Sequence, residues 1–314
     1  MTKIKTATVS ASPLLFEDGR ASFIISEAED GLVLRFFLKE MLSLSHRTLA
    51  ALKRRADGIL LNGKHATVRA VLRKGDTVSL LLSDAHGDEN GAIAPIDLPL
   101  DILYEDEHVC VCNKPSGMPT HPSFRHRDDT LANALAYYYR GVPFVFRAVN
   151  RLDKDTSGIV LTAKTAFAAA SLARAMLDGA VKKEYLAVVL GVPEENGEVH
   201  RPIRRKEGSV ILREVCDRGG EEAHTLYTRL YTDECYSLVH VRTLTGRTHQ
   251  IRVHMASEGH PLAGDTLYGG DGSFCRAALH AYRLSFPHPL TKQTVTVTAP
   301  LPHDLSHFSP FLSI

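Results

Sequence analysis

Three polar segments of this 314-residue chain hold groups that could perform chemistry, and each interrupts a region patterned as strands. The first is Asn150–Gly158, in which four charged side chains lie between two apolar stretches. An ionised carboxylate that faces a cleft can stabilise a developing positive charge or attack as a nucleophile. Because charged groups are costly to bury, such a loop is expected to face a cleft or solvent. A solvated surface loop is the more frequent case, so this segment alone does not identify a site.

The second segment, Lys182–Ala187, places basic residues ahead of an apolar strand that carries Tyr185. The ordinary interpretation of this tyrosine is a core aromatic residue whose hydroxyl reaches the surface. The third segment, Leu244–His254, consists of a strand end, a turn and a helix that begins near Thr248. Taken one at a time, neither segment identifies a reaction.

Metal ligation is not favoured by the histidine and cysteine spacings. His249 and His254 are five residues apart, so they do not share a helical face as the two histidines of a helical zinc site do. Cys110 and Cys112 alternate within an apolar strand, and no second pair of ligands completes a tetrahedral site around them. We therefore interpret the two cysteines as small core residues and predict no metal.

The elements that would position the three segments belong to a module over residues 100–314. Several successive strands have no helix between them, which favours an α+β fold with mainly antiparallel pairing over a doubly wound sheet. Helices are expected at Thr130–Tyr139 and Thr165–Asp178, the second capped by Thr165 and ended by Gly179. The predicted strands are Val109–Cys112, Ile159–Ala163, Tyr185–Leu190, Thr225–Tyr231, Ser237–Thr243, Ala278–Phe286 and Thr294–Thr298.

A smaller α+β module is predicted over residues 22–84, joined to the larger one by a polar linker, rich in small residues, over 85–99. An apolar helical run precedes a helix at His46–Arg54 that Ser45 would cap. The dipeptide Asn62-Gly63 then predicts a tight hairpin turn. Paired helices also suggest a helix-turn-helix that binds DNA, but a hairpin directly after the second helix counts against that interpretation.

Composition limits the class of protein. An apolar fraction of 44% is ordinary for a globular chain, and a net charge of +1 argues against a protein that coats nucleic acid non-specifically. Basic residues are nevertheless concentrated between Arg47 and Lys74, which contain eight against one acid. Five cysteines without regular spacing suit a reducing cytoplasm, and neither a signal peptide nor a membrane-spanning run is predicted.

Together, the three segments resemble the signature segments of RluA-type pseudouridine synthases, in the same order. The matching stretches are "RLDKDTSGIVLTAKT", "KKEYLAVVLG" and "TLTGRTHQIRVHMASEGHPLAGDTLYG", with weaker similarity in "LYEDEHVCVCNKPSGMPTHP" and "ALHAYRLSFPHP". The first module, with "SLSHRTLAALKRRADGILLNGK", resembles an S-four type RNA-binding domain. The resemblance implies a pseudouridine synthase fold, a mixed and mainly antiparallel sheet with flanking helices and a central cleft.

The resemblance also implies roles for particular residues. Asp153 would be the catalytic aspartate, Tyr185 the tyrosine beside the target base, and Arg252 the arginine that pairs with the aspartate. The sequence departs from the family at Asn150, where histidine is common, and asparagine cannot titrate near neutral pH. RNA contacts are expected at Arg151, which would displace the target base, and at Lys53, Arg54, Arg55 and Arg247.

We therefore expect a cytoplasmic, monomeric enzyme that isomerises uridine in structured RNA without a cofactor. Large-subunit ribosomal RNA is the expected partner and tRNA the alternative. A catalytically inactive RNA-binding or ribosome-assembly protein on the same fold is a second interpretation, suggested by Asn150. A nucleosidase is a third; it would need a second catalytic carboxylate, for which Asp155 is the nearest candidate.

Overall fold

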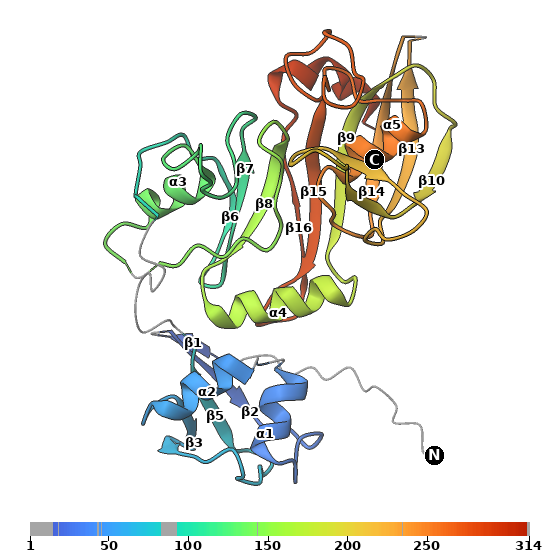
Figure 1. Cartoon of the computed structure of the whole chain (residues 1–314). Helices are drawn as coiled ribbons and strands as arrows, with labels where there is room; N and C mark the ends of the chain where they lie inside the picture. Colours follow the sequence, from blue (N-terminus) through green and yellow to red (C-terminus); the bar gives the residue numbers. More distant parts are fainter. Residues whose placement is uncertain are drawn as a thin grey trace, which may run out of the picture.

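The computed structural model describes residues 15–17, 19–42, 44, 46–82, 93–142, 144–233 and 235–312, which form a small and a large unit (Figure 1). The small unit is a five-stranded antiparallel sheet in the order β1-β2-β5-β3-β4. Its strands are β1 (Leu15–Glu17), β2 (Arg20–Ile24), β3 (Ile59–Leu61), β4 (Lys64–His65) and β5 (Thr77–Leu81). Strand β1 thus begins seven residues before the predicted start of this module at residue 22.

Helical segments of the small unit cover one face of this sheet and share its apolar core. They are α1 (Leu34–Phe36), the π-helical turn η1 (Phe37–Met41) and α2 (His46–Arg54). The predicted hairpin is confirmed, because Asn62 and Gly63 both have a positive φ, of 52° and 75°. The predicted cap Ser45 lies outside the described residues. The same core includes Phe167 and Leu290 of the large unit, so the two units share buried apolar surface.

The large unit contains a nine-stranded sheet in the order β10-β13-β14-β9-β15-β8-β7-β6, with β16 paired to β15. Within the part of the chain that is described, its pairings are antiparallel except for β8 with β15, which confirms the predicted α+β class. Its strands are β6 (Ile102–Glu105), β7 (Val109–Lys114), β8 (Ser157–Ala163), β9 (Lys182–Leu190), β10 (Asn196–His200), β13 (His224–Thr232), β14 (Tyr236–Thr243), β15 (Leu279–Pro287) and β16 (Thr294–Thr298). A separate ribbon pairs β11 (Ile203–Arg205) with β12 (Arg213–Val215).

Helices cover both faces of this sheet (Figure 1). One face carries α3 (Leu131–Tyr138) and α5 (Gln250–Ser257), and the other carries α4 (Ala166–Leu177) and the 3-10 helix η2 (His303–Phe311). Because side chains alternate along a strand, Cys110 and Cys112 of β7 pack with α3, whereas Val109 and Val111 pack with α4. The prediction that both cysteines are core residues is confirmed. No helix among the described residues has the length and apolarity needed to cross a membrane.

The two halves of the large sheet meet at Gly158, where β8 and β15 run parallel. Its φ is +106°, and a Cβ atom there would lie 2.2 Å from the carbonyl oxygen of Ala281. Only glycine allows this backbone conformation together with so close an approach. Gly158 lies five residues after Asp153, so its close contact with Ala281 fixes the end of the charged loop against the centre of the sheet.

Candidate active site

A cleft of about 860 Å³ opens on the sheet face that carries α3 and α5. It is lined mainly by residues within 119–126, 148–156 and 243–252, together with Lys183 and Tyr185 of β9. Its volume lies within the range of pockets that enclose a small ligand. The structure therefore brings all three polar segments to one cavity.

The loop that presents Asp153 is held from behind by a buried lysine. The Nζ of Lys114, which is fully buried, donates to the carbonyl oxygens of Pro115 at 2.8 Å, Met118 at 2.6 Å and Lys154 at 3.1 Å. Burial lowers the pKa of Lys114 to about 7. These bonds tie the "KPSGMPT" segment to the loop directly after Asp153.

Further bonds fix the same loop at both ends. The Thr120 hydroxyl donates to the Leu152 carbonyl at 3.0 Å and accepts from its N–H at 3.2 Å. The carbonyl of Asp155 accepts from Ser116 at 2.8 Å and from Arg276 at 3.2 Å. The backbone on either side of Asp153 is therefore anchored, and the carboxylate itself remains 26% exposed to the cleft.

Asn150 has a structural partner that the sequence does not reveal. Its amide nitrogen donates to the carbonyl of Ile159 at 3.0 Å, and its oxygen accepts from the N–H of Leu161 at 2.8 Å. A side chain amide can extend a backbone ladder in this way because it has both a donor and an acceptor. Asn150 thus secures the start of the loop to β8, a role that needs no titrating group.

Arg252 is shared between two carboxylates. Its Nε and Nη2 donate to Asp265 at 2.6 and 2.8 Å, and its Nη1 lies 3.4 Å from Oδ2 of Asp153. The side chains of Arg252 and Asp265 are only 7% and 1% exposed. Burial alone would lower the pKa of Arg252, but Asp265 and then Asp153 hold it above its ordinary value. The predicted pair of Arg252 with Asp153 is present, and Asp265 is the residue that orients it.

His249 approaches Asp153 from the turn before α5. Its Nε2 lies 3.9 Å from Oδ2 of Asp153, and its Nδ1 is 2.7 Å from the hydroxyl of Tyr268. It adopts the left-handed conformation, with φ of 56°, which places the ring over the cleft as α5 begins. Burial lowers the pKa of His249, so the neutral ring is favoured at neutral pH. The helix begins two residues later than the predicted start near Thr248.

Tyr185 lies where two apolar clusters meet, one packed on α3 and the other on α5. Burial, together with the charge of Asp153, raises the pKa of Tyr185 to about 12. Lys183, two residues earlier on the same face of β9, is buried and donates from Nζ to the carbonyl of Thr245 at 2.7 Å. Burial and the nearby Arg247 lower the pKa of Lys183 to about 8.

Sequence comparison relates this chain to known proteins. Residues 108–257 match the family model for RNA pseudouridylate synthase. The uncharacterized RNA pseudouridine synthase YjbO of Bacillus subtilis (strain 168) is 43% identical over 269 residues, 84% of this chain and 94% of the relative. This chain belongs to the RNA pseudouridine synthase family. A ribosomal large subunit pseudouridine synthase D of Xylella fastidiosa (strain Temecula1) is 40% identical over 79% of the chain and 78% of its own length.

A solved structure supports the same fold. Human RNA pseudouridylate synthase domain containing 1 superposes with a TM-score of 0.55 at 30% identity, covering 65% of this chain and 84% of the human one. The chain is thus an isomerase of the pseudouridine synthase family, and the predicted reaction class and fold are confirmed.

The synthase fold gathers most, but not all, of the predicted site residues. Asp153, Tyr185, Arg252, Arg151 and Arg247 all line the cleft. Arg247 is also anchored, since its Nε donates to the carbonyl of Glu222 at 2.8 Å.

The other three predicted RNA contacts lie in the small unit instead, Lys53 and Arg54 at the end of α2 and Arg55 directly after it. Lys53 and Arg54 are exposed there, whereas Arg55 is half-buried with its Nε 3.5 Å from Asp57. The structure therefore offers two separate cationic surfaces, one in the cleft and one on α2.

Sequence reasoning missed several residues that line the cleft or support the side chains in it: Lys114, Lys183, His249, Asp265 and Tyr268. Four of them lie within the signature stretches: Lys183 in "KKEYLAVVLG", His249 in "TGRTHQIR", and Asp265 and Tyr268 in "GDTLYG". Lys114 lies in the weaker stretch "NKPSGMPTHP", where a lysine inside an apolar run is the signal that could have singled it out.

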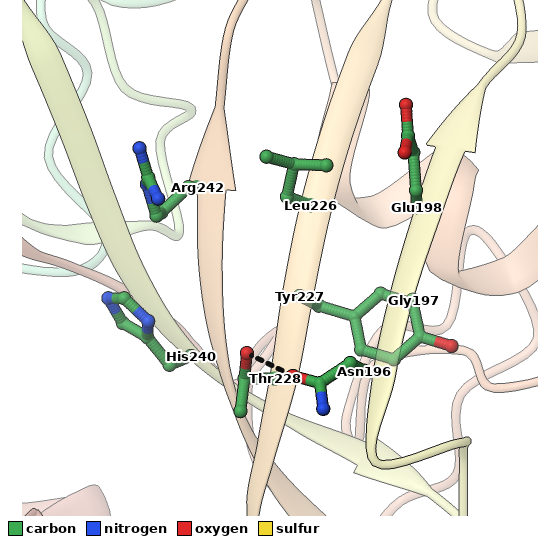
Figure 2. Close-up of a pocket in the computed structure, with 8 residues that line it drawn as sticks. All are labelled: Asn196, Gly197, Glu198, Leu226, Tyr227, Thr228, His240 and Arg242. Atoms are coloured by element: carbon green, nitrogen blue, oxygen red, sulfur yellow. Dashed lines mark hydrogen bonds between the residues drawn. The ribbon is translucent and has the colours of Figure 1, made fainter.

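A second hollow, of about 430 Å³, lies over β10, β13 and β14 and contains none of the predicted site residues (Figure 2). Its polar groups are engaged with one another: Thr228 donates to Asn196 at 2.9 Å, and His240 lies 2.9 Å from Glu184. Among the described residues, one group has metal-ligand spacing, with ligand atoms within 4.8 Å of one another: Glu198, His200 and His224. It lies outside the catalytic cleft.

Proposed function

We propose that this protein converts uridine to pseudouridine in ribosomal RNA, with Asp153 as the catalytic carboxylate. The observation that carries the proposal is the position of Asp153, which faces the cleft while a buried, oriented Arg252 lies 3.4 Å away. Asp265 is fully engaged with that arginine and almost inaccessible, so it suits support and not reaction. Asp153 is therefore the carboxylate that can meet a nucleotide while its charge is stabilised.

The reaction breaks the bond between the uracil nitrogen and the ribose, turns the base and rejoins it through carbon 5; a base then removes the proton from carbon 5, and the released nitrogen gains one. Breaking this bond leaves positive character on the sugar, as in glycoside hydrolysis. The carboxylate of Asp153 stabilises that charge, and the oriented guanidinium of Arg252 lies 3.4 Å from it. Tyr185, at the base of the cleft, stacks on the uracil while it turns. No electron or phosphate is transferred, so the chemistry requires no cofactor.

A uridine within a helix hides its glycosidic bond, so the nucleotide must enter the cleft unpaired or flipped out of its stack. Arg151 is exposed, lines the cleft and stands two residues before Asp153. It is suited to fill the gap that the base leaves. Flipping a base costs a few kcal/mol, which a cation in that gap can offset.

The proposed substrate is large-subunit ribosomal RNA, because several similar proteins carry that specificity in their names. We assign the segment 22–84 as an S-four type RNA-binding module, in which Lys53 and Arg54 of α2 would contact phosphates. Such contacts hold the RNA in register without reading its sequence. Replacing both by alanine should weaken RNA binding and lower its dependence on salt.

Two variants test the catalytic assignment. Asp153→Asn should lower turnover by about 10³-fold or more while RNA binding is retained, because the shape of the side chain is kept. Asp155→Asn, an exposed residue of the same loop, is the matched control and should stay active. Turnover is measured as pseudouridine formed in unmodified large-subunit ribosomal RNA. An active Asp153→Asn variant would disprove the assignment, and release of free uracil would indicate a nucleosidase.

The RNA target is tested by mapping pseudouridines in total RNA from strains with and without this gene. Loss of a position in large-subunit ribosomal RNA supports the proposed substrate. Loss confined to tRNA would replace that substrate and keep the reaction. If no position is lost and wild-type protein is inactive on every RNA, the chain is an RNA-binding protein on this fold.

A further inference from the structure

One rim of the catalytic cleft carries an exposed aromatic side chain. Ser123 and His126 both line the cleft, and their backbones exchange two hydrogen bonds, of 2.8 and 3.1 Å. They close a tight turn that holds Phe124 and Arg125 at its tip. The side chain of Phe124 is 87% exposed, more than any other large apolar residue in the described segments.

An exposed apolar residue by itself is normal on a protein surface. The position of Phe124 distinguishes it, because the same segment is bonded to the catalytic loop. Thr120, three residues before Ser123, exchanges hydrogen bonds with the backbone of Leu152, the residue before Asp153. The turn is thus held at a fixed place beside the catalytic carboxylate.

The chemistry around Phe124 suits a nucleic acid. Arg125 shares the tip of the turn, and Arg127 follows it on the chain. The acid Asp129 is engaged with His126, whose Nδ1 lies 2.6 Å from its carboxylate. Alternating aromatic and cationic groups are typical of surfaces that bind single-stranded nucleic acid, where rings stack on bases and cations meet phosphates.

We propose that Phe124 is a stacking platform for an unpaired base of the RNA beside the target uridine, with Arg125 against an adjoining phosphate. This inference rests on the proposed function, since it assumes that RNA enters the cleft at Asp153. The platform holds the strand after the target nucleotide has left its stack. It acts in binding and has no part in breaking the glycosidic bond.

The chain contains no tryptophan, so a single introduced indole reports on its own surroundings. Phe124→Trp keeps an aromatic ring at the tip of the turn, and its fluorescence should be quenched by a short single-stranded oligouridylate in proportion to binding. Val192→Trp is the control, because Val192 is 46% exposed beyond the end of β9 remote from Tyr185. Its fluorescence should stay unchanged. An indole at position 124 that is not quenched at saturating RNA would overturn the proposal.

Substitutions test the energetic role of the ring. Phe124→Ala should raise KM for ribosomal RNA about 10-fold and leave kcat unchanged, since loss of one stacked base weakens binding by about 5- to 150-fold. Phe124→Tyr keeps a stacking ring and should restore the wild-type KM. An unchanged KM in Phe124→Ala would contradict the platform.

The two proposals fail in different ways. If Asp153→Asn remains active while the indole at position 124 is quenched, the catalytic assignment is lost and the RNA platform stands. If Asp153→Asn is inactive and the fluorescence of Phe124→Trp is not quenched by RNA, only the proposal for Phe124 is wrong.

Discussion

Arg252, which lines the cleft, forms a buried bidentate pair with Asp265, with bonds of 2.6 and 2.8 Å. The pair fixes the plane of the guanidinium, so that only Nη1 is directed at Asp153, at 3.4 Å. Because Asp265 takes the shorter bonds, it holds the guanidinium in place, and the side chain of Asp153 remains 26% exposed.

Removing the charge of Asp265 should damage both stability and activity. Asp265→Asn leaves the buried Arg252 without its main counterion, and breaking such a pair costs about 3–5 kcal/mol. We expect the free energy of unfolding, measured with urea, to fall by about 3 kcal/mol, and kcat to fall as well. Asp304→Asn is the control. The side chain of Asp304, which pairs with Arg276, is 32% exposed, so this variant should lose less stability than Asp265→Asn. Equal losses in the two variants would contradict the special role of Asp265.

The pKa of Tyr185, raised to about 12, keeps its hydroxyl protonated at neutral pH. If a free tyrosinate were required, turnover would rise about tenfold for each pH unit below that pKa. We expect no such rise between about pH 7 and 9. Tyr185→Phe, which retains the stacking ring, should therefore keep the wild-type profile over this range. A wild-type slope of tenfold per unit that disappears in Tyr185→Phe would show that tyrosinate is the base.

Lys114 should give the protein a measurable pH dependence of stability. Its pKa falls from 10.5 in the unfolded chain to about 7 in the folded one. Between these values the unfolded chain binds more protons, so the free energy of unfolding rises with pH and falls as pH drops toward 7. We expect an increase of roughly 2 kcal/mol between about pH 7 and 9 that Lys114→Met abolishes.

The Lys114→Met variant should also lose activity, because three backbone carbonyls around the catalytic loop lose their donor. Lys154→Met is the matched control, since its side chain is exposed in the same loop and only its carbonyl is used. Urea unfolding at several pH values measures the slope. A wild-type slope that persists in Lys114→Met would refute this account.

Gly158→Ala should destabilise the large unit by more than about 3 kcal/mol, since it combines an unfavourable φ with a clash against the Ala281 carbonyl. Gly117→Ala provides the comparison: its φ is +83°, but an added Cβ meets nothing within 4 Å. That change should cost only about 1 kcal/mol. Thermal unfolding of both variants distinguishes a packing constraint from a purely conformational one.

The sequence by itself determined the secondary structure where the pattern is strong. The capped helices α3 and α4, the Asn62-Gly63 turn and the central strands all follow from local periodicity and capping chemistry. The strands of the large unit that it missed, β6, β10, β11 and β12, are short and have few buried residues, so they lack a clear apolar pattern. Their pairing depends on neighbouring strands that are far away along the chain.

The chemistry of the site divides in the same way. Motif resemblance led to Asp153, Tyr185 and Arg252, whose types and order are written in the chain. Tertiary structure alone showed that Asp265 orients Arg252, that Lys114 holds the catalytic loop and that Asn150 bonds to β8. Each of these roles depends on which groups become buried together, and burial decides both hydrogen-bond partners and pKa values. Local sequence cannot specify that environment, because the contacting residues come from distant segments.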